Sequence, residues 1–294
     1  MKKYLRIAIL FLITEVAISG SLQAQYLDGM LGANCSTMAM GGASTGYVSS
    51  SHMLFSNASL VSFSSHAFQI STSFYGLDDG SYNSVSGYAR LGGGALQAGW
   101  RRLSLSGTKE NCYDLAYSRR IGGVFSISTG AKYIHTEYST DDTSSALAFD
   151  LGAAARLPLW TNGTNITIGA TLKNLGWYLK GDGDLPLNLN FGAALRVPFK
   201  ERHAVTLAAD YGYLFNPESC RGSQISFGAE YSYLDMLFLR GGYHIGDDRN
   251  YIPSYASVGA GIKFLFFNVE FAYIFTDEDT YLKDPYMINV GLNF

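Results

Sequence analysis

The feature that most constrains the fold of this chain is a repeated pattern in which apolar and polar residues alternate over segments of about ten residues. In one such segment, Leu189, Phe191 and Ala193 alternate with Asn188 and Asn190. A period of two places the two sets on opposite faces of a β-strand. The segments exceed the about 5–6 residues of an average strand and match the roughly 9–11 residues of a strand that crosses a membrane. The pattern therefore predicts an all-β protein whose strands span a bilayer.

About fourteen of these segments follow one another from residue 67 onwards, and bacterial single-chain barrels have an even number of strands. One face of each segment is apolar, and the other carries small or polar residues. In a membrane barrel the apolar face meets lipid and the second face lines a polar lumen. We therefore predict a transmembrane antiparallel β-barrel. Its strands are expected near 67–75, 82–91, 95–105, 112–120, 124–138, 145–157, 164–176, 186–197, 203–214, 223–233, 236–246, 255–265, 267–276 and 286–294.

The turns between the predicted strands fall into two classes. If both chain ends lie in the periplasm, alternate turns face outward, and every acidic pair then falls on an outward turn, whereas the inward turns are tight. Two interpretations of this acidic outer rim stay open. In the first, the charge keeps the rim of the protein solvated at the cell surface. In the second, its carboxylates bridge divalent cations to lipopolysaccharide or bind calcium. The rim comprises Asp78, Asp79, Asp141, Asp142, Asp182, Asp184, Asp247, Asp248, Asp277, Glu278 and Asp279.

The last predicted strand ends in an aromatic residue. Its apolar face consists of Tyr286, Ile288, Val290, Leu292 and Phe294. A final strand with one apolar face and a terminal aromatic is typical of outer-membrane β-barrels. These five residues are therefore predicted to form the C-terminal signal for barrel assembly.

The first 66 residues do not follow the alternating pattern. Residues 1–24 run from basic residues through an apolar stretch to small residues ending at Ala24, as in a secretory signal peptide. Residues 25–66 are rich in Gly, Ala and Ser, and we interpret them as a short N-terminal hatch or plug. The expected organisation is therefore a signal peptide at 1–24, a hatch at 25–66 and an outer-membrane barrel at 67–294.

Composition excludes several classes of function. Only 15% of the residues are charged and 14% are aromatic, which suits a wall that faces lipid, since soluble proteins average about 25% charged residues. The net charge of −3 argues against nucleic acid, whose binding depends on basic patches. The three cysteines and five histidines show no disulfide, zinc or protease spacing, although His244 near Asp247 and Asp248 could form a metal pair on a loop that is otherwise simply solvated. We therefore expect no enzymatic activity, no catalytic residue, no metal and no cofactor.

Two short segments of the predicted hatch resemble the N-terminal signature of the PorV/PorQ family, a FadL-like outer-membrane group associated with type IX secretion. They are Met40-Gly41-Gly42-Ala43 and the stretch that begins at Ser56-Asn57. The similarity continues through the barrel, at residues 173–176, 185–189, 228–231, 239–243 and 272–273. The family fold is a fourteen-stranded barrel with an N-terminal hatch, which the resemblance therefore implies for this chain.

The resemblance also implies a function. It predicts a non-enzymatic accessory of protein secretion in the outer membrane of a Gram-negative bacterium, which docks or handles cargo. Its partners would be outer-membrane lipid, lipopolysaccharide, a secretion translocon and secreted cargo proteins. Two alternatives stay open: FadL-like passive transport of hydrophobic compounds, and a purely structural role in the envelope.

Overall fold

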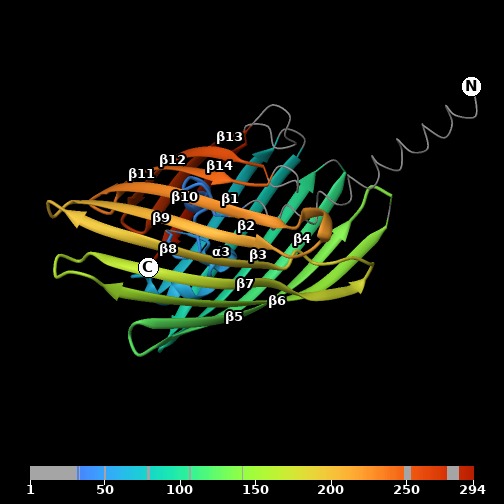
Figure 1. Ribbon diagram of the computed structural model, residues 1–294, viewed down its shortest axis with the longest axis horizontal. Helices are drawn as coiled ribbons and strands as arrows, with labels where there is room; N and C mark the ends of the chain where they lie inside the picture. The colour runs from blue at the N-terminus through green and yellow to red at the C-terminus, as the bar shows by residue number, and fades with distance from the viewer. Residues whose placement is uncertain are drawn as a thin grey trace, which may run out of the picture.

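The structure is a computed structural model that describes residues 32, 34–49, 51–77, 80–105, 107–140, 142–247, 253–276 and 285–294. Within these residues, fourteen antiparallel strands close into a barrel in which β1 pairs with β14 (Figure 1). The strands are β1 Phe68–Leu77, β2 Gly80–Leu91, β3 Gly94–Leu105, β4 Thr108–Ile121, β5 Phe125–Glu137, β6 Thr143–Pro158, β7 Asn165–Lys180, β8 Asn188–Phe199, β9 His203–Leu214, β10 Gly222–Tyr233, β11 Leu237–Ile245, β12 Tyr255–Phe264, β13 Phe267–Phe275 and β14 Tyr286–Asn293. The prediction of an all-β antiparallel barrel is confirmed. No helix among the described residues is long and apolar enough to cross a membrane.

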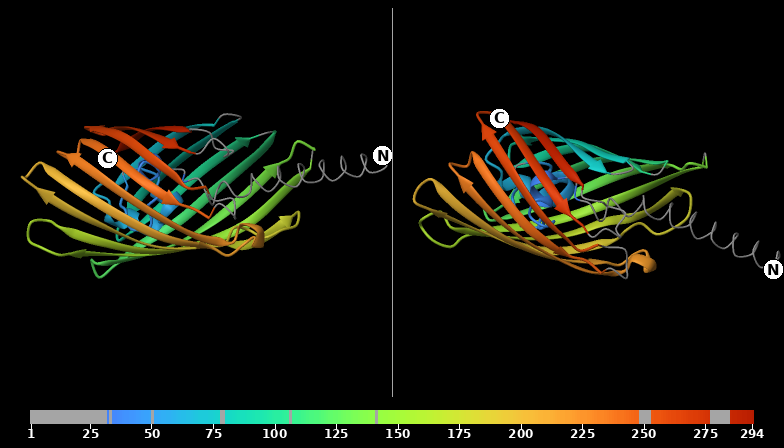
Figure 2. Two further views of the ribbon diagram at one scale, coloured as in Figure 1. Left: turned by 45° about the horizontal axis from the view of Figure 1, so that its top comes forward. Right: turned by 90° about the horizontal axis from the view of Figure 1, so that it is seen from above.

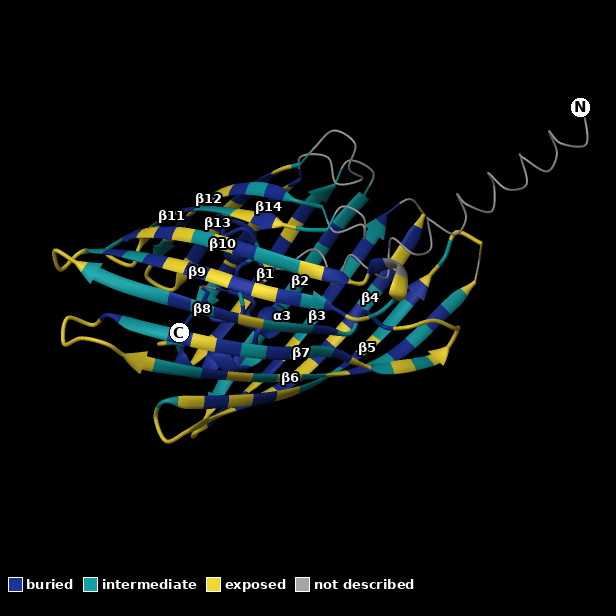
Figure 3. Ribbon diagram, in the orientation of Figure 1, coloured by how far each residue is buried: buried dark blue, intermediate teal, exposed yellow. Residues whose placement is uncertain are grey.

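The alternation in the sequence becomes an alternation of buried and more exposed residues along the strands (Figure 3). Outward side chains such as Phe74, Phe191 and Leu239 are 43%, 50% and 62% exposed, whereas inward ones such as Ser73 and Arg240 are buried. Large apolar side chains can stay exposed on the outside only if lipid covers them. The apolar outer wall is therefore the surface that a membrane barrel presents to the bilayer.

The two ends of the barrel differ in the length of their connections. At one end, which we call the short-turn end, strands are joined by turns such as residues 92–93 and 265–266. Left-handed backbone lets these turns close, with φ of +61° at Gly92 and 54° at Leu265. At the other end, which we call the long-loop end, residues 181–187 and 215–221 connect the strands. Because outer-membrane barrels have short periplasmic turns, the short-turn end corresponds to the periplasmic side.

Several strands are longer than their apolar pattern indicates. The strand predicted at 112–120 begins at Thr108, and the strand predicted at 164–176 continues to Lys180. The pairing of β6 with β7 also shifts register between Phe149 and Leu151. Backbone pairing continues where polar residues carry the strands beyond the apolar band, so hydrophobic alternation marks the part in lipid rather than the whole strand.

The terminal aromatic residue lies at the seam where the first and last strands meet. The backbone N–H of Phe294 donates to the carbonyl of Phe68 at 2.9 Å, and the N–H of Phe68 donates back at 3.0 Å. The Phe294 ring stacks on Phe266 with 5.5 Å between centroids. Its outward ring thus extends the apolar wall at the short-turn end. Its role in assembly stays a prediction.

Residues 34–49 and 51–66 lie inside the barrel, where we call them the inner segment (Figure 2). They form three short helices: α2 Cys35–Met38, α3 Met53–Ser56 and the 3-10 helix η1 Ala58–Phe63. A second 3-10 helix, η2 Glu218–Cys220, lies in a loop. Helices this short gain little from their own hydrogen bonds, so contacts with the wall hold the inner segment in place.

Candidate functional site in the barrel lumen

The turn at Met40-Gly41-Gly42-Ala43 presses directly on the barrel wall. Gly41 and Gly42 have left-handed φ values of +67° and +84°. A Cβ atom on Gly242 of β11 would lie 2.1 Å from the nitrogen of Gly41, and one on Gly228 of β10 would lie 2.5 Å from the carbonyl oxygen of Met40. Only glycine allows backbones to approach this closely. These signature residues therefore form a tight turn that fits glycines of two neighbouring strands.

A buried carboxylate on β9 holds the chain immediately after that turn. Oδ2 of Asp210 accepts hydrogen bonds from the backbone N–H groups of Ser44 and Thr45, both at 2.7 Å. Hydrogen bonds to an ionised acceptor are roughly twice as strong as those between neutral groups. Asp210 therefore anchors the inner segment at the middle of the barrel.

Asn57, the other signature residue, links the inner segment to itself and to the wall. Its amide group donates to the carbonyl oxygens of Thr45 at 2.9 Å and of Ala153, on β6, at 3.2 Å. Its side-chain oxygen accepts from the N–H of Ser59 at 3.2 Å and so caps η1. Thr45 thus joins the two anchors, since its N–H binds Asp210 and its carbonyl binds Asn57.

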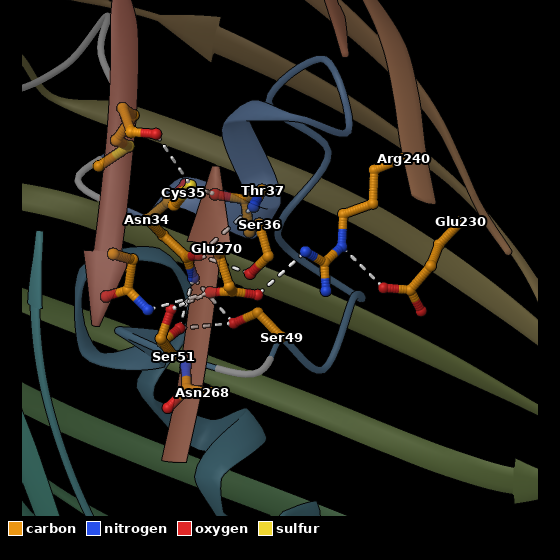
Figure 4. Close-up of polar contacts among 12 residues, drawn as sticks. Asn34, Cys35, Ser36, Thr37, Ser49, Ser51, Glu230, Arg240, Asn268 and Glu270 are labelled. Carbon is orange, nitrogen blue, oxygen red and sulfur yellow. Dashed lines mark hydrogen bonds and ion pairs between the residues drawn. The ribbon is translucent and has the colours of Figure 1, made fainter. Parts of the chain in front are cut away.

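A buried ion-pair cluster lies on β10, β11 and β13 (Figure 4). Arg240 Nε contacts Glu230 Oε2 at 2.8 Å, and Arg240 Nη1 contacts Glu270 Oε1 at 3.0 Å. The hydroxyl of Tyr47 donates to Glu230 at 2.5 Å, and that of Ser51 donates to Glu270 at 3.0 Å. Burial raises the pKa of the Tyr47 phenol well above its usual value, so this hydroxyl stays a donor. Each carboxylate therefore binds two partners, Arg240 of the wall and one hydroxyl group of the inner segment.

Asn34 folds the start of the inner segment against its middle (Figure 4). Its amide group donates to the hydroxyl of Ser49 at 2.8 Å and to the carbonyl of Ser51 at 2.6 Å. Its side-chain oxygen accepts from the N–H of Thr37 at 3.3 Å, which caps α2. The loop that carries Tyr47 and Ser51 to the ion-pair cluster is closed by this one side chain.

Three further cations line the wall on β3, β5 and β7. Arg101 pairs with Asp114 at 3.0 Å, and its guanidinium lies 4.8 Å from the ring centroid of Phe55. Lys132 pairs with Asp150 at 2.9 Å. Lys173 donates to the carbonyl oxygen of Phe55 at 2.7 Å. The middle of the lumen is therefore polar, and α3 lies among charged side chains.

His52 is buried with left-handed backbone at φ 49°. Its ring nitrogens lie 2.6 Å from the Ser86 hydroxyl and 3.0 Å from the side-chain oxygen of Asn289. Burial lowers the pKa of His52 to about 4, so the imidazole is neutral at neutral pH. This residue joins the inner segment to β2 and β14.

Part of the lumen is apolar towards the long-loop end. Inward-facing side chains there pack with Met38 of α2 into one buried cluster, which we call the apolar lumen cluster. They include Tyr75, Tyr82, Leu103, Ile274 and Met287. These residues end or begin their strands at the long-loop end. On other strands the inward side chains at this end are polar, as at Glu110 and Asn188.

The acidic rim is only partly within the described residues. Asp142, Asp182, Asp184 and Asp247 follow β5, β7 and β11 and lie at the long-loop end. The other seven residues of the rim lie outside the described part of the chain. No group of three or more His, Cys, Asp or Glu that could hold a metal occurs among the described residues. The His244 ring lies 2.9 Å from the Ser226 hydroxyl and stacks on Tyr255 inside the barrel.

The residues that hold the inner segment were only partly identifiable from the sequence. Met40, Gly41, Gly42, Ala43 and Asn57 were singled out, and they all lie in the lumen contacts described above. Asp210, Glu230, Arg240 and Glu270 alternate with apolar residues of their strands, which predicts that they face the lumen, but no local pattern marks them as anchors. A usable signal was present, because charges at the centre of a membrane-spanning strand are costly unless they are paired.

No family model and no curated protein matches the chain. Solved structures with the same fold do match. The toluene transporter TbuX of Ralstonia pickettii has 11% identity and a TM-score of 0.65, with 90% of this chain and 99% of that chain covered. The toluene transporter TodX of Pseudomonas putida has 15% identity and a TM-score of 0.63, with 88% and 96% covered. The monoaromatic hydrocarbon channel CymD has 13% identity and a TM-score of 0.63, with 90% and 98% covered.

At these identities, the similarity is one of fold. This chain shares the closed antiparallel β-barrel fold of these solved structures. Together with the apolar outer wall, it indicates the outer membrane of a Gram-negative bacterium as the location of this chain. The resemblance to PorV/PorQ proteins stays a prediction.

Proposed function

We propose that the protein is a passive transporter that admits small hydrophobic compounds across the outer membrane, with the inner segment as its closing element. The observation that carries this proposal is the apolar lumen cluster, formed by Tyr75, Leu103, Ile274 and their neighbours at the long-loop end. When Met38 moves away with the inner segment, a hydrophobic solute that replaces it gains roughly 25 cal/mol per Å² of buried apolar surface. The names of the solved structures with this fold, toluene transporters and a hydrocarbon channel, support the same class of solute.

Passage then requires the inner segment to move. Its contacts with the wall combine hydrogen bonds to charged wall residues with apolar packing of side chains such as Met38 and Leu60. A single hydrogen bond contributes a net of only about 0.5–1.5 kcal/mol, because water replaces it when it opens. The hydrogen-bonded part of the interface is therefore exchangeable with water, which suits a closing element that opens and returns. Neither catalysis nor a cofactor is part of this proposal, and lipid and lipopolysaccharide would be the surroundings of the wall.

The test is uptake of radiolabelled toluene, at low concentration, by cells that carry the protein in their outer membrane. We expect uptake above that of vector-only cells. Leu103→Asn, which makes the apolar lumen cluster more polar, should reduce uptake. Leu239→Asn, a matched change on the outer wall, should leave it unchanged provided that the protein is inserted in equal amount. Uptake equal to that of vector-only cells would refute the proposal.

A second candidate is the accessory of protein secretion that the PorV/PorQ resemblance implies. The observation in its favour is that Met40–Ala43 and Asn57, the residues that carry the resemblance, are all anchoring contacts of the inner segment. Purification in mild detergent tests it: a secretion translocon or cargo that elutes with the protein, and is lost in Asn57→Ala, would favour this role. Elution of the barrel alone would favour transport.

A further inference from the structure

Among the residues that the structure describes, five arginine and lysine side chains face the lumen at its short-turn end, and we call them the cationic mouth. They are Arg90, Arg120, Arg156, Arg196 and Lys263. Each belongs to a different even-numbered strand, namely β2, β4, β6, β8 and β12, and each lies within the last four residues of its strand. Because all even-numbered strands run towards the short-turn end, the antiparallel order gathers these residues in one ring.

Most of these cations have neutral partners within the described residues. Arg90 donates to the carbonyl of Ser64 at 2.9 Å, and Arg120 donates to that of Gly123 at 2.7 Å. Lys263 Nζ lies 2.6 Å from Nε2 of His66. Burial and the positive charge of Lys263 lower the pKa of His66, so the imidazole is a neutral partner.

Arg156 has only neutral partners among the described residues. Its guanidinium donates to the Thr167 hydroxyl at 3.2 Å and to the carbonyl of Phe63 at 3.1 Å, both neutral. The charges of Arg120 and Arg196 act on it repulsively. The exception in the ring is Arg196, which pairs with Asp235 at 2.7 Å.

A hollow of about 400 Å³ opens beside these residues. Arg156, Arg196 and Lys263 line it together with Arg240, whereas Glu230 and Asp235 are its acidic residues. The aromatic rings of Phe63 and Phe238 complete part of the wall. The hollow thus combines excess positive charge with aromatic surface.

We propose that this hollow is a binding site for a small organic anion that carries a carboxylate or phosphate group. A guanidinium presents a planar fork of donors that matches these groups, and the fork of Arg156 has a nitrogen, Nη2, with no partner among the described residues. The anion offsets the repulsion within the ring, and the apolar part of the molecule lies against Phe63 or Phe238. The site faces the periplasmic side, so it takes a free solute from there.

The inference does not depend on the proposed transport. The apolar lumen cluster is at the other end of the lumen, and the anion site stands if toluene uptake fails. Conversely, loss of anion binding should leave toluene uptake unchanged.

The experiment is calorimetric titration of the full-length protein in detergent with benzoate, inorganic phosphate and benzyl alcohol. Benzoate and phosphate should bind at low salt and bind more weakly at high salt, because the site is open enough for screening. Benzyl alcohol has the ring without the charge and should bind at least about tenfold more weakly than benzoate, since a hydrogen bond to a charged group contributes about 1.5–3 kcal/mol.

Two variants and a matched control locate the site. Arg156→Gln and Lys263→Gln should each weaken benzoate binding by about tenfold, and Arg156→Lys should restore part of it. Arg119→Gln removes the same charge from the outward face of the same end and should change nothing. Heat-modifiable mobility on gels confirms that each variant is folded. Equal weakening in Arg119→Gln, equal binding of benzyl alcohol, or no binding of either anion would overturn the proposal.

Discussion

The outer wall and the inner segment of this protein are built by opposite means. The wall presents large apolar side chains such as Phe191 and Leu239 to lipid. Each strand pairs with the strands before and after it in the chain, and β1 also pairs with β14. The inner segment has three short helices and is held by charges that come from strands far away in the sequence, such as Asp210 and Glu270. The wall thus depends on a pattern, whereas the inner segment depends on individual side chains. Single substitutions should therefore act very differently on the two.

The largest effect is expected from Arg240→Ala. It leaves Glu230 and Glu270 buried without their counter-charge, and breaking a buried ion pair costs about 3–5 kcal/mol. Leu239→Ala, at the adjacent outward position, shortens a lipid-facing side chain and should cost much less. Thermal unfolding followed by heat-modifiable mobility measures both. An equal loss of thermal stability in the two variants would show that the wall and the inner segment do not respond differently to substitution.

A slightly smaller effect is expected when charge enters the lipid face. Phe191→Arg should reduce insertion by roughly 2–4 kcal/mol if the position lies at mid-bilayer. Asn190→Arg points into the lumen and should be milder. The amount of each variant in the outer-membrane fraction gives the comparison. If both variants inserted equally well, the assignment of the two faces would be wrong at this strand.

Close backbone contacts at glycines also hold the inner segment against the wall. Gly242→Ala places a methyl group 2.1 Å from the nitrogen of Gly41, so the inner segment must shift, at a cost of about 1–3 kcal/mol. Gly93→Ala, in an open turn with nothing within 4 Å, is the matched control. Limited proteolysis should cut the inner segment faster in Gly242→Ala only. If the wild type were cut as fast as Gly242→Ala, the close contact at Gly242 would not hold the inner segment.

The smallest effect concerns pH. Since burial lowers the pKa of His52 from 6.5 to about 4, the released inner segment binds a proton more readily than the docked one. The contribution of His52 is present above pH 6.5 and is lost as pH falls towards 4, which amounts to about 2 kcal/mol on reaching pH 5. Proteolysis of the inner segment should therefore accelerate on acidification, and less so in His52→Asn. An identical pH response in that variant would assign the effect to other groups.

The sequence predicted the wall better than the lumen for a physical reason. Alternation is a local property, so Leu189, Phe191 and Ala193 reveal their face without knowledge of any other strand. The contact of Asp210 with Ser44 and Thr45 joins residues that are far apart in the chain, and no local pattern encodes it. The cationic mouth was missed for the same reason. Arg156 and Lys263 look like ordinary lumen residues until the antiparallel order brings the ends of their strands together.

Single-channel conductance in planar bilayers tests directly whether the inner segment closes the lumen. The intact protein should conduct almost no ions. A chain that lacks residues 34–63, checked for its folded barrel by heat-modifiable mobility, should show a steady open conductance. Arg240→Ala should show intermittent openings, because the contacts of Tyr47 and Ser51 are weakened with the ion-pair cluster. If the intact protein conducted as well as the shortened chain, the inner segment would not be what closes the lumen.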